Sequence, residues 1–253
     1  MHALIVLAHP EPHSFNAQLK DTAVETFKAQ GHTVEVSDLY AEDFQPAEGP
    51  RHFARRARPE RFGAQTEQRH AHDTGTTAAD VAAEIAKLER ADFVLFQYPI
   101  WWFGMPAMLK GWIDRVFTFG GVYTAKQRYE NGKFLGKRAM LSVTAGAPEP
   151  SYSYNGRSGE LALLLWPMHK SLVYVGFQVL PPFLSAGIQD GIKYDRPVDE
   201  RHRIDAYKKG LAERLGRLDA LAPLPFNMLA DFDDTGRLKP GAPGYSPFIR
   251  AEP

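Results

Sequence analysis

The sequence predicts an α/β protein with a mainly parallel, doubly wound sheet, because short apolar runs alternate with helical stretches along the chain. The first run, residues 3–8 (ALIVLA), is wholly apolar, which is typical of a strand buried on both faces of a parallel sheet. An amphipathic helix is expected over residues 15–30, ending at Gly31, and an alternating strand over residues 33–39. These segments form a β-α-β unit, whose crossover is expected to be right-handed.

The alternation continues to residue 221. We expect further strands over residues 92–98, 137–144 and 177–185, and helices over residues 79–90, 106–118, 159–175 and 199–221. Pro167 is expected to bend its helix, and Pro181 and Pro182 are expected to break the last strand.

This pattern indicates one catalytic domain over residues 1–221. Within it, residues 41–77 are polar and rich in arginine and histidine, and we expect a long loop there. Residues 222–253 are rich in proline and glycine and are expected to form an irregular tail.

The composition narrows the classes of function. Lys and Arg number 30 and Asp and Glu number 30, so no charge excess indicates binding to nucleic acid or to a membrane surface. There is no cysteine, which excludes disulfides and thiolate nucleophiles, and no converging set of histidines predicts a metal site. No apolar run approaches the roughly 20 residues that span a bilayer. We expect a soluble, cytoplasmic protein.

Ligands of open α/β sheets bind beyond the carboxyl ends of the strands, so the segment after the first strand is informative. Residues 9–16 (HPEPHSFN) lead into a helix at Ser14 or Asn16, and free N–H groups at a helix start favour a phosphate. Neither a glycine-rich dinucleotide motif nor a P-loop is present. An ordinary N-cap at Ser14 is the alternative.

Two later strand ends complete the pattern. Residues 98–106 (YPIWWFGMP) place two tryptophans and a phenylalanine in one loop, which can form the walls of a site for a flat ring or cover an interface. Residues 144–148 (TAGAP) are small and allow close approach of backbone donors to a ligand. Together the three loops suit a flavin nucleotide.

Five stretches occur in the order typical of a known family: LAHPEPHSFN, SDLYAEDFQP, FQYPIWWFGMPAMLKGWIDRVF, LSVTAG and GELALLLWPMHKSLVYVGFQVL. Over most of residues 1–221 the sequence resembles the NAD(P)H:quinone oxidoreductases of the DT-diaphorase type. The resemblance implies a flavodoxin-like fold with five parallel strands in the order 2-1-3-4-5. It also implies a homodimer with shared active sites, bound FAD (or, as an alternative, FMN), and ping-pong transfer of hydride from NAD(P)H to a quinone-like acceptor.

The resemblance also implies three sets of site residues. The catalytic pair is Tyr152 and Ser158. The residues expected to contact the cofactor are His9, Ser14, Phe15, Asn16, Gln18, Pro99, Ile100, Trp101, Trp102, Phe103, Thr144, Ala145, Gly146, Ala147 and Tyr152. The residues expected to contact the substrates are Trp102, Phe103, Tyr123, Gly146, Ala147 and Phe177.

The sequence departs from the family pattern at several positions. Ser158 stands where the family has its catalytic histidine, Ala125 replaces a second pocket tyrosine, and Ala147 replaces a pocket glycine. These departures leave the electron acceptor open. Two other functions remain as alternatives: a flavoprotein regulatory subunit of a potassium-efflux transporter, and a reductase of nitro or azo compounds.

Overall fold

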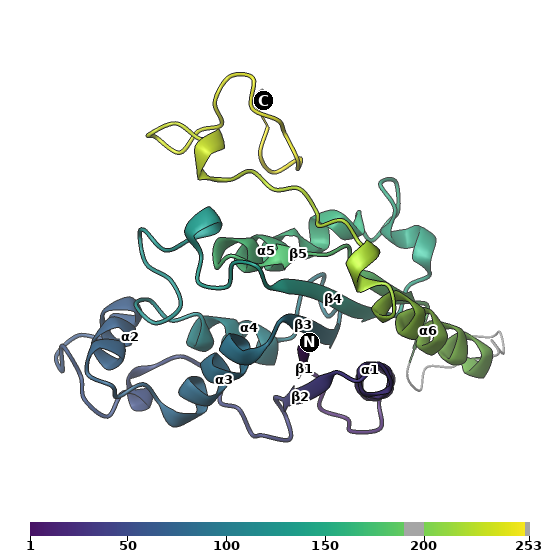
Figure 1. Ribbon diagram of the computed structural model, residues 1–253, viewed down its shortest axis with the longest axis horizontal. Coiled ribbons are helices and arrows are strands. Elements are labelled where there is room, and N and C mark those ends of the chain that lie inside the picture. The colour runs from purple at the N-terminus through teal and green to yellow at the C-terminus, as the bar shows by residue number, and fades with distance from the viewer. Residues whose placement is uncertain (190–199, 251–253) are drawn as a thin grey trace.

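The computed structural model describes residues 1–189 and 200–250, and a parallel sheet lies at its centre (Figure 1). The strand order is β2-β1-β3-β4-β5, with β6 also paired to β4, which confirms the predicted fold class and strand order. The strands are β1 His2–Leu7, β2 Thr33–Asp38, β3 Phe93–Pro99, β4 Arg138–Ala145, β5 Gln178–Val179 and β6 Phe183–Ala186.

Helices cover both faces of the sheet (Figure 1). One face packs against α1 (Phe15–Ala29) and α6 (Glu200–Leu215). The other packs against α3 (Ala79–Arg90), α4 (Ala107–Val116) and α5 (Leu161–Tyr174). None of the helices within the described ranges is long and apolar enough to cross a membrane.

The apolar first strand is buried on both sides, as its sequence predicts. Leu4 and Val6 of β1 belong to the core under α3, α4 and α5, whereas Ala3 and Ile5 belong to the core under α1 and α6. Successive side chains of a strand point to opposite faces, so a strand with helices on both sides needs apolar residues at every position.

Two of the prolines interrupt a strand where the sequence predicts. Pro167 lies inside α5, and Pro181 and Pro182 separate β5 from β6. Both short strands pair in parallel with β4, so together they occupy the edge position expected for a single fifth strand. The break matters for the site, because it lets β6 run beside the carboxyl end of β4.

The prediction of one long loop over residues 41–77 is wrong. This segment contains a 3-10 turn, η1 (Pro50–His52), and a ten-residue helix, α2 (Ala64–Asp73). The carboxylate of Glu67 is fully buried and accepts hydrogen bonds from the backbone N–H groups of Ala57 at 2.7 Å and Arg58 at 3.3 Å. Its oxygen also lies 3.0 Å from the guanidinium Nε of Arg56. Burial alone raises the pKa of Glu67, but these donors outweigh burial and lower that pKa.

Smaller differences concern helix ends. Pro106 is the residue before α4 and not its first helical residue, and α6 ends at Leu215 before the 3-10 turn η4 (Leu218–Ala220). Asp199, the expected start of the last helix, lies outside the described residues.

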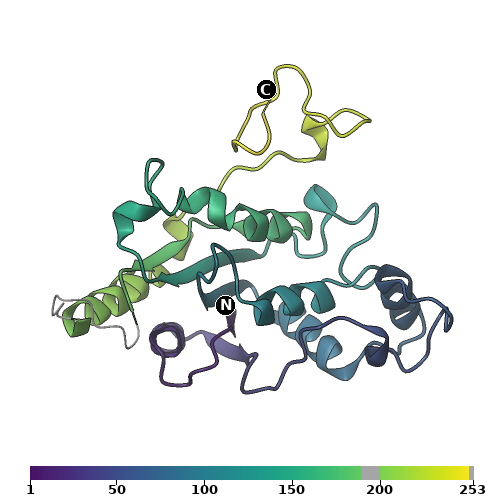
Figure 2. The same ribbon diagram turned by 180° about the vertical axis from the view of Figure 1, so that it is seen from behind.

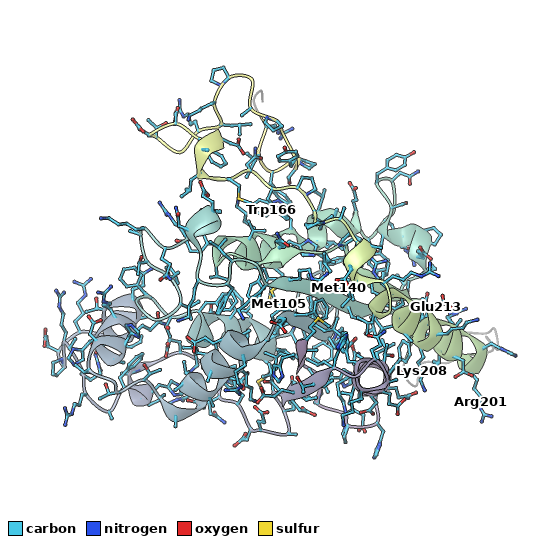
Figure 3. All side chains as sticks on the ribbon, viewed as in Figure 1. Met105, Met140, Trp166, Arg201, Lys208 and Glu213 are labelled. Carbon is cyan, nitrogen blue, oxygen red and sulfur yellow. The ribbon has the colours of Figure 1, made fainter. Side chains whose placement is uncertain are left out.

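On the outer surface of α6, Arg201 projects into solvent, whereas Met140 of β4 is fully buried (Figure 3).

The chain beyond residue 222 runs away from the sheet as a separate arm (Figure 2). It contains one 3-10 turn, η5 (Leu229–Asp231), within its described part. The arm is attached to the body by a backbone hydrogen bond from Leu224 to Val179 (2.7 Å) and by packing of Phe248 on Trp166 of α5, with ring centroids 4.9 Å apart.

Candidate functional site

A cleft of about 890 Å³ lies at the carboxyl ends of β1, β3 and β4, and all three predicted loops line it. Its volume is within the roughly 300–1,000 Å³ that is usual for small-molecule sites. The expected cofactor residues that line it are His9, Ser14, Phe15, Asn16, Gln18, Pro99, Ile100, Trp101, Thr144, Ala145, Gly146 and Ala147. The structure therefore brings most of that set together.

The loop after β1 prepares the start of α1. The hydroxyl of Ser14 accepts a hydrogen bond from the N–H of Ala17 at 3.1 Å, so Ser14 is the N-cap of the helix. The N–H groups of Phe15 and Asn16 have no acceptor among the described residues, and the first turn carries no acidic residue. Free N–H groups and the positive end of the helix dipole favour an anionic group in this part of the cleft.

A buried chain of hydrogen bonds ties the three loops together. The Gln97 side chain donates to Asn16 Oδ1 at 2.9 Å, and the Asn16 side chain donates to Thr144 Oγ1 at 2.9 Å. These residues come from β3, α1 and β4, and their exposed fractions are 0%, 4% and 6%. Since Thr144 Oγ1 already accepts a bond, its own hydroxyl hydrogen remains free to point into the cleft. Gln97 was not singled out in the sequence, because nothing in an apolar strand marks it as part of a site.

The aromatic loop after β3 is a tight two-residue hairpin. Trp101 and Gly104 exchange backbone hydrogen bonds of 3.0 and 3.1 Å, while Trp102 and Phe103 between them have φ angles of 50° and 62°. Turns of this kind normally use asparagine and glycine, because a bulky side chain at positive φ is strained by about 1–3 kcal/mol. The turn holds Trp102 and Phe103 in solvent, with exposed fractions of 96% and 60%. Neither lines the cleft of its own chain.

The loop after β4 offers backbone donors. Its carbonyl oxygens are already engaged: Gly146 accepts from Gln189 Nε2 at 3.0 Å, and Ala147 accepts from the N–H of Gly187 at 2.9 Å. Within the described ranges, no acceptor is found for the N–H groups of Gly146 and Ala147. These donors line the cleft and are available to carbonyl or ring-nitrogen acceptors of a ligand.

The predicted catalytic pair lies on a closed loop beside the cleft. Tyr152 ends the 3-10 turn η3 (Glu149–Tyr152), and the N–H of Ser158 donates to the carbonyl of Ser151 at 3.0 Å. Gly156 makes this closure possible, because a Cβ there would lie 2.3 Å from the Ser151 carbonyl oxygen. Tyr152 and Ser158 are both half-buried, and the residue between them that lines the cleft is Arg157.

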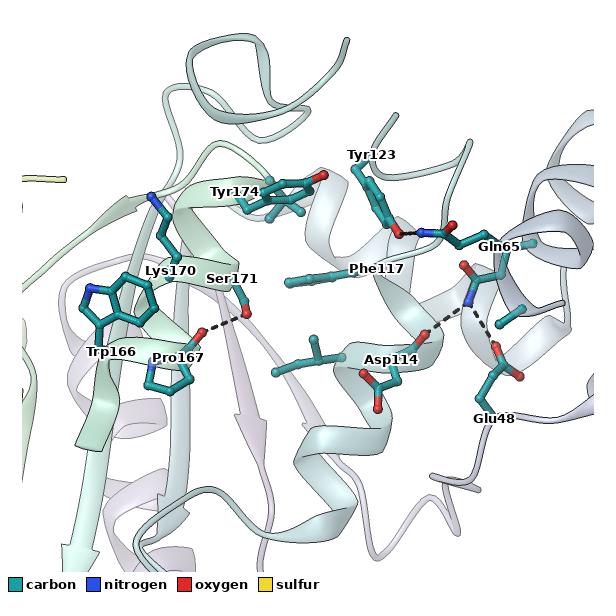
Figure 4. Close-up of a pocket in the computed structure, with 14 residues that line it drawn as sticks. Glu48, Gln65, Asp114, Phe117, Tyr123, Trp166, Pro167, Lys170, Ser171 and Tyr174 are labelled. Carbon is teal, nitrogen blue, oxygen red and sulfur yellow. Dashed lines mark hydrogen bonds between the residues drawn. The ribbon is translucent and has the colours of Figure 1, made fainter. Parts of the chain in front are cut away.

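Tyr123 lies in a second cavity of about 580 Å³, between α4, α5 and α2 (Figure 4). Its hydroxyl accepts a hydrogen bond from Gln65 Nε2 at 3.0 Å, and its ring contacts Tyr174 at 5.5 Å. Phe117 and Trp166 complete the aromatic lining of this cavity. Within a single chain, Tyr123 therefore lies in a different cavity from Gly146 and Ala147.

The expectation for Phe177 is corrected by its burial. Only 3% of this residue is exposed, and its ring stacks on Phe134 with centroids 4.8 Å apart. It packs in the core and does not line the cleft or the second cavity. Tyr174, three residues earlier on α5, lines the second cavity instead. Sequence reasoning also missed His13, Gln189 and Ile204 in the cleft lining.

Comparison with known proteins identifies the family. A family model described as a flavodoxin-like fold matches residues 1–209. The chain is 40% identical to NAD(P)H dehydrogenase (quinone) 1 of Cavia porcellus over 233 residues, which cover 91% of this chain and 82% of that protein. The chain belongs to this family of NAD(P)H:quinone oxidoreductases. It is therefore an oxidoreductase, as the sequence motifs indicated.

Other relatives support the same assignment. Human ribosyldihydronicotinamide dehydrogenase (quinone) is 41% identical over 184 residues, covering 72% of this chain and 80% of that protein. A Klebsiella pneumoniae structure, described provisionally as a quinone reductase, superposes with a TM-score of 0.86 at 38% identity and covers 97% of both chains. An ancillary protein of the glutathione-regulated potassium-efflux system from an Enterobacter species is 38% identical, but over only 41% of this chain.

Replacing Gln97 with leucine tests the buried hydrogen-bond chain. The change keeps approximately the same volume but leaves Asn16 Oδ1 buried without a donor, so we expect a loss of about 1–3 kcal/mol in the free energy of unfolding. Urea unfolding followed by circular dichroism measures it. Gln178→Leu, at an exposed position of β5, is the control and should change the stability by less than about 0.5 kcal/mol. Equal stability of the two variants would show that these hydrogen bonds contribute nothing to the free energy of unfolding.

Proposed function

We propose that this protein binds FAD without a covalent link and uses it to pass two electrons from NAD(P)H to a quinone-like acceptor by a ping-pong mechanism. The observation that carries the proposal is the convergence of the three strand-end loops on one cleft. Membership of the quinone oxidoreductase family supports the choice of flavin, donor and acceptor.

The groups in the cleft fit a flavin nucleotide. The free N–H groups of Phe15 and Asn16 at the start of α1 suit its phosphates. The N–H groups of Gly146 and Ala147 and the hydroxyl of Thr144 suit the carbonyl and nitrogen atoms of its ring. The size of the cleft favours FAD over the smaller FMN, and FMN remains the alternative.

A bound flavin supplies the ability to accept a hydride and release two electrons. The protein's part is to orient the ring, exclude water from one side of it and stabilise the charge that appears on reduction. We propose that Tyr152 donates a hydrogen bond toward that charge. Ser158 cannot become cationic at neutral pH, so a relay between tyrosine and histidine does not operate in this chain.

The role of a transporter regulator is the less favoured alternative. The potassium-efflux ancillary protein matches less than half of this chain, whereas quinone oxidoreductases match most of it. Copurification of the chain with a membrane transporter, together with an absence of quinone reduction, would reverse this preference.

The purified protein should be yellow, and its extracted cofactor should run as FAD on chromatography. Initial rates at several fixed quinone concentrations should give parallel double-reciprocal lines, because nicotinamide and quinone are expected to occupy the same place in turn. A colourless protein that fails to take up FAD would refute the flavin proposal. Intersecting lines would refute the ping-pong order and leave the flavin assignment intact.

Flavin reduction by NAD(P)H, followed by stopped flow, tests Tyr152 and Ser158. Tyr152→Phe removes a donor to developing charge, which can cost about 2.7–4 kcal/mol in a dry site and should cost less at a half-buried position. Ser158→Ala should change the rate little, and Ser158→His should leave it unchanged or raise it. If Ser158→Ala is as damaging as Tyr152→Phe, then the serine has a direct role in the reaction.

We propose further that the working unit is a homodimer in which each acceptor site uses both chains. The turn at Trp102 and Phe103 exposes a large apolar surface, and exposed apolar patches commonly mark interfaces. Tyr123 lies in a different cavity of the same chain. If the acceptor contacts both Trp102 and Tyr123, as the family resemblance implies, then the two residues come from different chains.

Mixed dimers give a direct test of the shared site. Trp102→Ala and Tyr123→Ala homodimers should each lose activity, because each removes one wall from every site. In a coexpressed heterodimer of the two variants, purified by two different tags, one site regains both wild-type residues. The heterodimer should recover up to about half of the wild-type activity. No recovery would indicate that both residues act within one chain, and undiminished single variants would remove both from the site.

A further inference from the structure

The charged residues that line the flavin cleft are few. Among the described lining residues the ionisable side chains are His9, Glu11, His13 and Arg157. The two histidines lie in the loop that leads into α1, where the phosphates are expected. Arg157 comes from a different loop, after β4, and it is the one lining residue in the described ranges with a permanent positive charge.

The position of Arg157 is determined by its backbone. The hydrogen bond from Ser158 N–H to the Ser151 carbonyl (3.0 Å) closes the loop immediately after Arg157. The absence of a Cβ at Gly156 allows the loop to pack against Ser151 immediately before it. Arg157 is therefore held next to the turn that carries Tyr152, although its side chain is exposed.

No carboxylate in the described part of the chain neutralises Arg157. No ion pair or side-chain hydrogen bond of its guanidinium is found there, whereas other cations, such as Arg56 and Arg115, are paired. An arginine at the wall of a cleft, fixed at its backbone and without a partner, has its five donors available to a ligand.

The proposed reaction creates a charge that such a donor would stabilise. A hydride carries one proton and two electrons, and the nicotinamide leaves as a cation, so the ring that accepts the hydride gains one negative charge unless a further proton follows. Neither the phenol of Tyr152 nor the hydroxyl of Ser158 can carry a positive charge near neutral pH. A guanidinium keeps its positive charge near neutral pH, and its hydrogen bonds become stronger as the acceptor becomes negative.

We propose that Arg157 stabilises the reduced, negatively charged form of the bound flavin, the part that a cationic histidine at position 158 would otherwise play. This proposal rests on the proposed function, since it requires that a flavin occupies the cleft. It assigns to Arg157 a role in setting the reduction potential and not in holding the phosphates.

The experiment compares Arg157→Gln and Arg157→Lys with the wild-type flavoprotein. Arg217→Gln is the matched control, because Arg217 is exposed beyond the end of α6 and does not line the cleft. The two-electron midpoint potential is measured by equilibration with a reference dye, and the dissociation constant of oxidised FAD is measured by titration of the apoprotein. For Arg157→Gln we expect binding of reduced relative to oxidised flavin to weaken about tenfold, which is a fall of about 30 mV in potential. Arg157→Lys should recover part of this shift, and Arg217→Gln should show none.

Three results would overturn the proposal. An unchanged potential with weaker binding of oxidised FAD would show that Arg157 holds a phosphate. An unchanged potential with a raised KM for NADPH alone would show that it contacts the 2′-phosphate of the donor. An unchanged potential with both other quantities unchanged would make it a surface arginine. A wild-type protein that binds no flavin would refute the proposed function itself, and the role of Arg157 with it.

Discussion

The arrangement of the candidate site depends on one buried chain of hydrogen bonds, from Gln97 through Asn16 to Thr144. Leaving a buried polar group unpaired costs free energy, and the amide of Asn16 finds both its acceptor and its donor only when β3, α1 and β4 hold their observed positions. A shift of any of the three loops would leave a buried amide unpaired. These hydrogen bonds therefore hold β3, α1 and β4 in fixed positions relative to one another at this edge of the sheet.

The fixed positions of these strand ends explain how the aromatic turn can remain strained. Ile100 donates its N–H to the Thr144 carbonyl at 2.8 Å, so the turn begins from a residue fixed by the same strand pair that holds the chain. Positive φ angles at both Trp102 and Phe103 persist only where the surrounding structure determines them. Within one chain, burial of these rings does not offset the strain, because the turn presents both rings to solvent. It is accounted for if the rings are presented to a ligand or to a second chain.

The sequence predicts the sheet well because burial on both faces leaves a direct mark on composition. From Ala3 to Leu7 the strand β1 has no polar residue, and Pro181 and Pro182 interrupt the pairing of the last strand. Helix α2 was missed because its sequence is polar, and it is stabilised by hydrogen bonds of Glu67 with the backbone of Ala57 and Arg58 in the preceding loop. Phe177 was misplaced for the opposite reason: in an apolar run, sequence alone does not tell a core residue from a cavity wall. Gln97 and Arg157 were missed because only the fold brings Gln97 beside Asn16 and places Arg157 at the wall of the cleft.

The cleft at the strand ends and the cavity that contains Tyr123 differ in their lining, as the proposed shared site would require. The cleft at the strand ends offers backbone donors, a helix start and the cation of Arg157, which suit a charged cofactor. The second cavity has the rings of Phe117, Tyr123, Trp166 and Tyr174 in its wall, beside the charged side chains of Glu48, Asp114 and Lys170, and these rings can stack on a flat ligand. If a flavin occupies the first cleft as proposed, such a surface opposite its exposed face would let nicotinamide and quinone stack in turn. In a single chain these surfaces are separate cavities, and the proposed dimer is the arrangement that lets the polar half of one chain meet the aromatic half of the other.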